Sequence, residues 1–432
     1  MNPLEQKILA AITDRQDELY EELAALIRFD SQNFISHGLE LECQKYIAGR
    51  YRDIGLITEM YAPDDVAGIK EHPAYNPGRN TTSDRPNVSG ILPSTKPDSG
   101  SIMLAGHTDT MPVGDLSKWH VDPFGGVITE DKIIGLGAGD NKAGIAVPLF
   151  VMEIMKQFDV QFDKTINITA YVDEEYGGGG GALAASLKYD NDVIVNLDGG
   201  NFEIWRAALG GGGFKIIVRY ENPTDTVTPL LPAVTAVVAA LENIGADLRA
   251  ELHSNPYFTG SDMERSAMRI IELKAGEGGS KLDEAALTFV AYTNAGEQWL
   301  RNRLQSELQN VRDMYKDQGI IIDQPISTTR FFESAESKDP DGYIEILQGA
   351  ADNVTGRRLK ETGACLTDLS IFLSYGSDCS FNFGILRDFA LEGGAHQPNE
   401  FVTKQELLDL ARTIALFLLR AAGGRKRQAR SI

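Results

Sequence analysis

Two pairs of polar residues in the sequence carry side chains that can bind metal ions or transfer protons. His107 and Asp109 stand two residues apart at the end of a predicted strand, so their side chains share one face of it. Glu174 and Glu175 are adjacent in VDEEYGG and point in different directions. One of them can therefore bind a metal ion while the other acts as general base on a water molecule.

Three more residues complete a candidate two-metal site. Asp140 lies in GLGAGDNKAG, where glycines allow a sharp turn and a close approach of a ligand. Asp198 ends the next predicted strand in NLDGG, and His396 stands in GGAHQPNE. Zinc takes imidazole and carboxylate ligands, and a two-metal site needs a carboxylate that bridges both ions. Asp140 suits that bridge.

Each motif alone has a simpler structural explanation. An isolated His-x-Asp is more often a hydrogen-bonded structural pair, an acidic pair often opens a helix, and GAGD is usually a turn. The combination is more specific, because the motifs occur in order at the ends of successive predicted strands. Open α/β sheets place their functional sites at those strand ends.

The elements that must position these residues alternate between strand and helix. The expected strands are VSGILP, SIMLAGHTDT, TINITAYVDEE and DVIVNLDGG, with helices over 142–157 and 182–188. This alternation predicts an α/β fold whose mixed, mostly parallel sheet has helices on both faces. The opening sixty residues predict two amphipathic helices, and the Pro-, Asn- and Gly-rich stretch 62–87 predicts a loop.

A change of pattern after Asp198 predicts an inserted α+β domain over residues 206–325, with long helices over 231–252 and 296–317. Residues 1–205 and 326–432 would then form a discontinuous catalytic domain that closes with a helix over 404–421. A chain of 432 residues exceeds the usual size of a single core, which agrees with two domains.

Composition excludes several classes of protein. A formal charge of −21 would repel nucleic acid. The chain holds no run of about 18 uncharged apolar residues, as a membrane span would need. The N-terminus lacks the pattern of a secretory signal, and three unclustered cysteines argue against a disulfide framework. We therefore expect a soluble, cytoplasmic protein, and we interpret the basic run 425–430 as a frayed tail.

The run AGHTDTMPVGDLSKWHVDPFGGVITEDKIIGLGAGDNKAG, followed by VDEEYGG, NLDGG and GGAHQPNEFV, resembles the di-zinc family of acetylornithine deacetylase, succinyl-diaminopimelate desuccinylase, aminoacylase and glutamate carboxypeptidase. The resemblance implies a zinc-exopeptidase-like fold with an inserted domain that serves as a lid and in dimerisation. A small amide or peptide substrate, two zinc ions per chain and a homodimer are then expected. Manganese and cobalt are alternatives, since they share nitrogen and oxygen ligands.

The resemblance also implies a cis peptide bond between Asp140 and Asn141. It further implies hydrolysis of an amide or peptide bond by a metal-activated water. The roles that it implies are His107 and Asp198 as ligands of one zinc, Glu175 and His396 as ligands of the other, Asp140 as the bridge, Asp109 as the carboxylate that orients the ring of His107, and Glu174 as general base.

The inserted domain departs from the family pattern. The family grips its substrate there with a His, an Asn and an Arg, but Gly279 and Tyr292 fall near the expected Asn and Arg positions. His253 is the only histidine of this domain, and we expect it at the surface rather than on the substrate. The sequence therefore predicts an atypical substrate.

Two other functions fit the sequence less well. A hydrolase-like protein that binds a ligand without catalysis is disfavoured, because all five metal ligands and the base are present. A nucleotide-binding protein is set aside, because no GxGxxG opens a helix after the first strand of the alternating region.

Overall fold

The computed structural model describes residues 1–96, 98–222, 229–277 and 281–427, which form two compact units. The first unit comprises residues 1–206, 337–361 and 371–432, and the second comprises 207–336 and 362–370. The second unit thus takes in residues 326–336 and 362–370 beyond the predicted 206–325. The assignment of an inserted domain stays a prediction.

The elements of the first unit are, in chain order, α1 Pro3–Asp14, α2 Gln16–Ile27, α3 Leu41–Ile54, β1 Ile57–Tyr61, β2 Asn87–Leu92, β3 Ser101–His107, β4 Val127–Ile128, β5 Lys132–Ile134, α4 Ala143–Gln157, β6 Val160–Gln161, β7 Thr165–Tyr171, α5 Gly180–Lys188, β8 Val193–Asn196, α9 Tyr343–Thr355, β16 Ser380–Phe383, β17 Phe401–Thr403, α11 Lys404–Ala421 and β18 Arg425–Lys426. Those of the second are α6 Leu231–His253, α7 Asp262–Arg265, β10 Met268–Glu277, β11 Lys281–Thr293, α8 Glu297–Tyr315, β12 Ile320–Ile322, β13 Ile326–Ser327 and β14 Ala335–Glu336. Three elements, β9 Ile204–Tyr220, β15 Glu361–Cys365 and α10 Leu369–Ile371, contain residues of both units.

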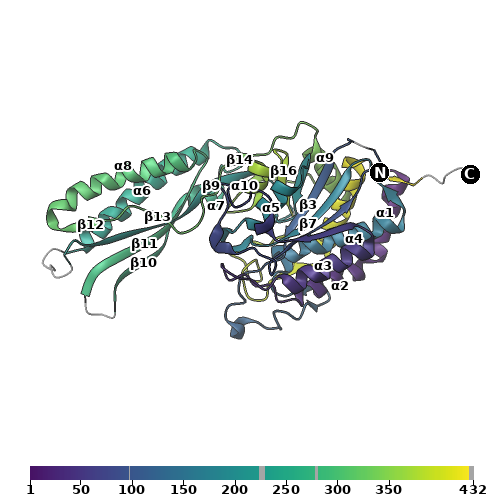
Figure 1. Ribbon diagram of the computed structural model, residues 1–432, viewed down its shortest axis with the longest axis horizontal. Helices are drawn as coiled ribbons and strands as arrows, with labels where there is room; N and C mark the ends of the chain where they lie inside the picture. Colours follow the sequence, from purple (N-terminus) through teal and green to yellow (C-terminus); the bar gives the residue numbers. More distant parts are fainter. Residues whose placement is uncertain (97, 223–228, 278–280, 428–432) are drawn as a thin grey trace, which may run out of the picture. The chain divides into compact units, whose positions relative to one another are not determined.

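The sheet of the first unit is mixed and has a parallel centre, which confirms the predicted α/β class. Strands β7, β3, β8 and β16 pair in that order and run parallel (Figure 1). Strands β2 and β1 continue the sheet antiparallel beyond β7, and the first residues of β9 pair antiparallel with β16. The carboxyl ends of three neighbouring parallel strands therefore meet at one edge.

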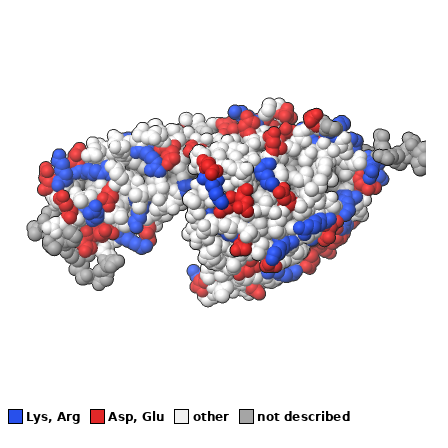
Figure 2. All heavy atoms as spheres, in the orientation of Figure 1, with Lys and Arg blue, Asp and Glu red and all other residues white. Residues whose placement is uncertain are grey.

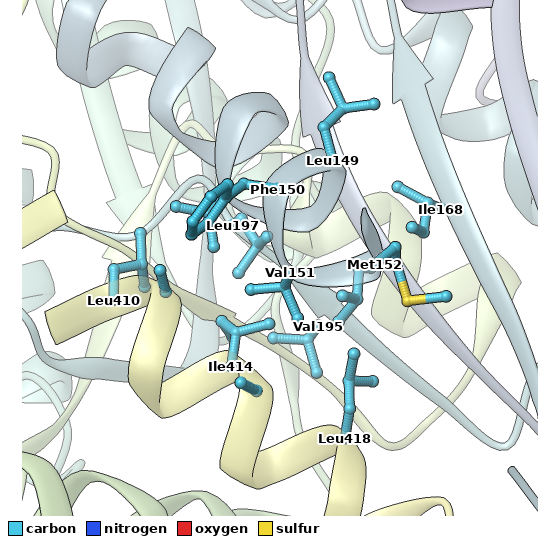
Figure 3. Close-up of a cluster of buried hydrophobic side chains, with 14 of the residues drawn as sticks. Leu149, Phe150, Val151, Met152, Ile168, Val195, Leu197, Leu410, Ile414 and Leu418 are labelled. Carbon is cyan, nitrogen blue, oxygen red and sulfur yellow. The ribbon is translucent and has the colours of Figure 1, made fainter. Parts of the chain in front are cut away.

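Helices cover both faces of this sheet because its strands are apolar on both sides. Ile102 and Leu104 of β3 belong to the core cluster that includes α4 and α11, whereas Met103 and Ala105 pack in the cluster of α5. Figure 3 shows the first of these cores, where side chains of α4 and α11 meet those of the sheet. Such continuous apolar runs are typical of parallel strands buried on both faces.

The opening residues form three helices instead of the predicted two. The chain leaves helical geometry at Arg15, with φ −107° and ψ 18°, so that α1 and α2 are separate. The third helix, α3, follows a further break over residues 28–40. The amphipathic period was visible in the sequence, but no Gly or Pro marks the break at Arg15.

The second unit holds antiparallel strands β9, β11 and β10, with α6 and α8 packed in their core. By length and composition alone, helix α6 is long and apolar enough to span a membrane, although the sequence predicted no such segment. Its buried residues, such as Val237 and Leu241, lie in the core of this unit. That packing is typical of a core helix. Figure 2 shows acidic and basic side chains interspersed on the visible surface.

Candidate metal centre

Three of the predicted site residues follow neighbouring parallel strands, and the sheet register brings them together. His107 is the last residue of β3 and stands opposite Tyr171 of β7, three residues before Glu174. On the other side of β3, Ala105 stands opposite Asn196, two residues before Asp198. The side chains that follow these three strands therefore share one edge of the sheet.

The remaining two predicted ligands reach this edge through a small second sheet. Strand β17 pairs antiparallel with β5, so that Phe401 lies opposite Ile134. This pairing places the segment of His396, which precedes β17, beside the loop of Asp140, which follows β5. Segments that lie about 260 residues apart in the sequence are thereby neighbours in the fold.

The five predicted ligands form two groups that share one residue. His107, Asp140 and Asp198 offer ligand atoms within 4.8 Å of one another, and so do Asp140, Glu175 and His396. His107 Nε2 lies 3.0 Å from Asp140 Oδ1 and 3.7 Å from Asp198 Oδ1. His396 Nε2 lies 3.3 Å from Asp140 Oδ2 and 3.0 Å from Glu175 Oε2. One oxygen of Asp140 thus faces each group.

The electrostatics of this cluster favour bound cations. Burial opposes charge on His107, but the hydrogen bonds and charges of Asp140 and Asp198 raise its pKa well above the ordinary value. Burial likewise opposes the shift at His396, whose pKa Asp140 and Glu175 raise to about 11. Burial and the charge of Asp140 raise the pKa of Glu175 to about 7. Crowded buried carboxylates of this kind need positive charge, which protons or metal ions can supply.

The donor set fits metal ions. Imidazole nitrogens and carboxylate oxygens are ligands of zinc and of similar divalent ions, and Asp140 is placed to contact two of them. His107, Asp140, Glu175 and Asp198 are buried, whereas His396 keeps 33 % of its side-chain surface exposed. The cluster is therefore closed on the protein side and open near His396, as a catalytic site must be.

The two other predicted residues lie beside the groups without belonging to them. Glu174 is half-buried and precedes Glu175, a predicted ligand. Asp109 accepts hydrogen bonds from the main-chain N–H groups of Glu174 and Glu175, at 3.2 and 3.1 Å, and from Asn33 Nδ2 at 2.8 Å. The ring Nδ1 of His107 lies 3.0 Å from the main-chain oxygen of Asp109 and 3.7 Å from its carboxylate. The nearest orienting group is thus the carbonyl instead of the expected carboxylate.

The loop of Asp140 depends on a residue that the sequence reasoning missed. Glu400 is buried and accepts hydrogen bonds from the main-chain N–H groups of Gly137, Gly139 and Asp140, at 2.9, 2.8 and 3.0 Å. Burial and the charge of Asp140 raise the pKa of Glu400 to about 7. In the sequence, Glu400 is the last residue of GGAHQPNE, four residues after His396.

The peptide bond between Asp140 and Asn141 is cis, as the resemblance implied. Asn141 Nδ2 donates to the main-chain oxygen of Leu197, 2.7 Å away, and so ties the loop to the end of β8. The approach is close, because a Cβ at Gly144 would lie 2.5 Å from Asn141 Oδ1 and 2.8 Å from the same oxygen of Leu197. Glycine at position 144 lets α4 begin directly against the strand end.

Two of the residues that were doubtful in the sequence, His253 and Tyr292, belong to the second unit. His253 belongs to the second unit, where its side chain is 69 % exposed and hydrogen-bonds Glu264 at 2.9 Å. Tyr292 is buried in the core of that unit. Gly279 lies outside the described residues, as do residues 428–430 of the basic tail.

Comparison with known proteins agrees with the fold and identifies the family. The model of Peptidase family M20/M25/M40 matches residues 103–420, so the chain belongs to this family of metallohydrolases, which act on amide and peptide bonds. The chain is 26 % identical to a succinyl-diaminopimelate desuccinylase of Methylobacterium nodulans over 302 residues, which cover 64 % of this chain and 72 % of that protein.

Solved structures show the same fold at low sequence identity. Human carnosine dipeptidase 1 superposes with a TM-score of 0.70 at 14 % identity, and the alignment covers 98 % of this chain and 99 % of that protein. The YXEP protein of Bacillus subtilis, described as a dinuclear metal-binding peptidase, superposes with a TM-score of 0.60 at 14 % identity. That alignment covers 94 % of this chain and 99 % of the other. The predicted resemblance and α/β fold are therefore confirmed.

Proposed function

We propose that this protein hydrolyses an amide or peptide bond with two metal ions held by the shared cluster. The observation that carries the proposal is that Asp140 belongs to both ligand groups, with one oxygen toward each. A carboxylate in that position can bridge two ions, as dinuclear hydrolases need. The proposed ligands are His107 and Asp198 for one ion, Glu175 and His396 for the other, and Asp140 for both.

When bound, the ions would supply Lewis acidity to water and to the substrate carbonyl. The chain itself would move the proton. Glu174 belongs to neither ligand group, is half-buried and is fixed through its main-chain N–H to Asp109. These features support Glu174 as the general base that accepts the proton of the attacking water and returns it to the leaving nitrogen.

Zinc is the metal we propose, because two imidazoles and three carboxylates match its usual ligands. Manganese or cobalt would fit the same donor set. The alternative of a catalytically inactive, ligand-binding protein receives no support from the structure, since the five proposed ligands lie together and Glu174 lies beside them.

The substrate is predicted to be atypical for the family. A free carboxylate is normally held by Arg or by a cluster of donors, because an unpaired desolvated charge is costly. Tyr292 is buried in an apolar core and His253 bonds Glu264, so neither is free to provide that grip. We therefore expect weak or no hydrolysis of acetylornithine, succinyl-diaminopimelate and simple acetyl amino acids, and faster hydrolysis of a larger or less acidic amide.

A screen of these amides with the zinc-loaded protein tests both the activity and the substrate. Hydrolysis of any of the first three with kcat/KM above about 10⁴ M⁻¹s⁻¹, the lower range of ordinary enzymes, would contradict the substrate prediction. Absence of hydrolysis across the whole panel with two ions bound would contradict the proposed activity.

We also propose a homodimer, formed through the edge of the second unit's sheet. Strand β10 is ten residues long, is the last strand of the order β9–β11–β10, and exposes 55 % of Ile271 and 51 % of Leu273. Long apolar strands at a sheet edge are usually covered by a partner. Light scattering at micromolar concentration should give twice the chain mass of 47.2 kDa, and a monomer would contradict the proposal.

The unpaired state of Cys43, Cys365 and Cys379 supports the proposed cytoplasmic location, because disulfides are rare in that compartment.

A further inference from the structure

The segment between β1 and β2, which the sequence presented only as a loop, contains two arginines with almost no solvent exposure. Arg79 is 4 % exposed and Arg85 is 2 % exposed. Arginine is almost never fully buried unless it is paired, so the partners of these two residues show what the segment does. Those partners lead to the turn that carries Glu174 and Glu175.

Arg79 binds this turn at two points. Its Nε donates to Asp173 Oδ1 at 2.8 Å, and its Nη2 donates to the main-chain oxygen of Glu175 at 2.7 Å. Asp173 is fully buried, so this ion pair is shielded from water. The planar guanidinium can hold two acceptors at fixed angles, which the single ammonium of lysine does less well.

A second arginine fixes the first. Arg85 Nη1 donates to the main-chain oxygen of Arg79 at 2.8 Å, and its Nη2 lies 3.4 Å from Asp173 Oδ1. Glu40, which is buried, pairs with Arg85 Nη2 at 2.6 Å and with its Nε at 3.0 Å. The network therefore has alternating charges and carries little net charge of its own.

The turn is held from its other side by Asp109. The N–H groups of Glu174 and Glu175 both donate to the carboxylate of Asp109, while the carbonyl of Glu175 accepts from Arg79. Residues Asp173 and Tyr176 at either end have φ of 68° and 58°, in the left-handed region that non-glycine residues rarely adopt. Such a backbone persists only where its surroundings hold it.

We propose that Arg79 is a positioning residue for the adjacent carboxylates Glu174 and Glu175. By fixing the main chain of the turn opposite Asp109, it directs Glu175 toward Asp140 and His396 and sets the direction of the adjacent Glu174. Arg79 touches neither a metal ligand atom nor the substrate in this role. The inference rests on the proposed function, because only a two-metal hydrolase uses both carboxylates in this way.

From the position of Arg79 we expect its loss to affect the binding of the two ions unequally. Glu175 belongs to the group with His396, whereas the group of His107 and Asp198 contains no residue of the turn. Loss of Arg79 should therefore weaken the binding of the ion at Glu175 and His396 much more than the binding of the other ion. Loss of a partner that orients a metal ligand usually costs about 10–100-fold in metal affinity or activity.

The test compares Arg79→Gln, Arg79→Lys and Asp173→Asn with the unmodified protein. Each is stripped with a chelator and titrated calorimetrically with Zn²⁺, and kcat and KM are then measured on the best amide of the screen. We expect Arg79→Gln to bind one ion normally and the other about 10–100-fold more weakly, with a similar fall in kcat and little change in KM. Arg79→Lys should retain part of the metal affinity and part of kcat. The double variant Arg79→Gln with Asp173→Asn should lose less affinity, on a free-energy scale, than the sum of the losses of the two single variants.

Arg50→Gln is a matched control, since Arg50 is a half-buried arginine of the same unit that pairs with Glu22 and Glu153. This variant should bind both ions as the unmodified protein does. Wild-type affinity for both ions together with wild-type kcat in Arg79→Gln would overturn the inference. Equal weakening of both ions, with a thermal destabilisation like that of Arg50→Gln, would overturn it as well. If the unmodified protein did not bind two ions, the proposed function itself would fail.

If Arg79→Gln does not fold, Arg79→Lys decides the question. An uneven loss of one ion in the lysine variant supports the positioning role, and normal binding of both ions with wild-type kcat overturns it.

Discussion

Replacement of Glu174 by Gln is expected to lower kcat by about 10²–10⁴-fold while two metal ions per chain stay bound. The amide keeps the size of the side chain but cannot accept a proton from water. Because Glu174 lies outside both ligand groups, its loss should leave metal content unchanged. Elemental analysis and steady-state kinetics on the same preparation measure both quantities.

The matched variant Glu175→Gln separates the two adjacent carboxylates. Glu175 lies in the group with Asp140 and His396, so this change should reduce metal content as well as activity. Loss of metal in Glu174→Gln with full metal content in Glu175→Gln would show that the two residues have exchanged roles.

Replacement of Asp140 by Ala should have the largest effect on metal content. Asp140 is the one residue that the two groups share, so both ions lose a ligand at once. The loss in affinity for each ion should exceed the 10–100-fold or so that follows removal of an outer partner of a ligand. Elemental analysis after dialysis should find little metal, and steady-state kinetics should find no measurable turnover.

Glu22→Ala provides the control for that experiment. Glu22 is also a buried carboxylate of the first unit, and it pairs with Arg50 and Tyr46. This variant should lose stability but keep two ions. Full occupancy of both ions in Asp140→Ala would refute the bridging assignment.

The sequence predicted well those parts of the site that local pattern determines. His107, Glu175 and Asp198 stand at or just after the ends of apolar strands, and alternation of strand and helix indicated that these strand ends would meet. Adjacency predicted only that Glu174 and Glu175 point in different directions, and the resemblance implied their separate roles. The strongly periodic helices, such as 231–252 and 404–421, were found within a residue or so of α6 and α11.

The missed residues act through contacts that no local pattern encodes. Glu400 matters because it accepts hydrogen bonds from a loop some 260 residues earlier, and Arg79 matters because it binds Asp173, 94 residues later. A Pro- and Gly-rich stretch indicates only that regular structure is absent. Nothing in its composition shows that its arginines are buried against an acidic turn.

The dependence of the Asp140 loop on Glu400 also has a meaning for biosynthesis. A ribosome that adds about 5–20 residues per second needs on the order of 10–50 s to pass from one residue to the other. During that interval the nascent loop has no carboxylate for its three N–H groups, and His396 has not yet been made. Translation that stops early would leave a chain with most of the ligands and no completed centre, so hydrolytic activity would mark molecules whose synthesis has passed Glu400.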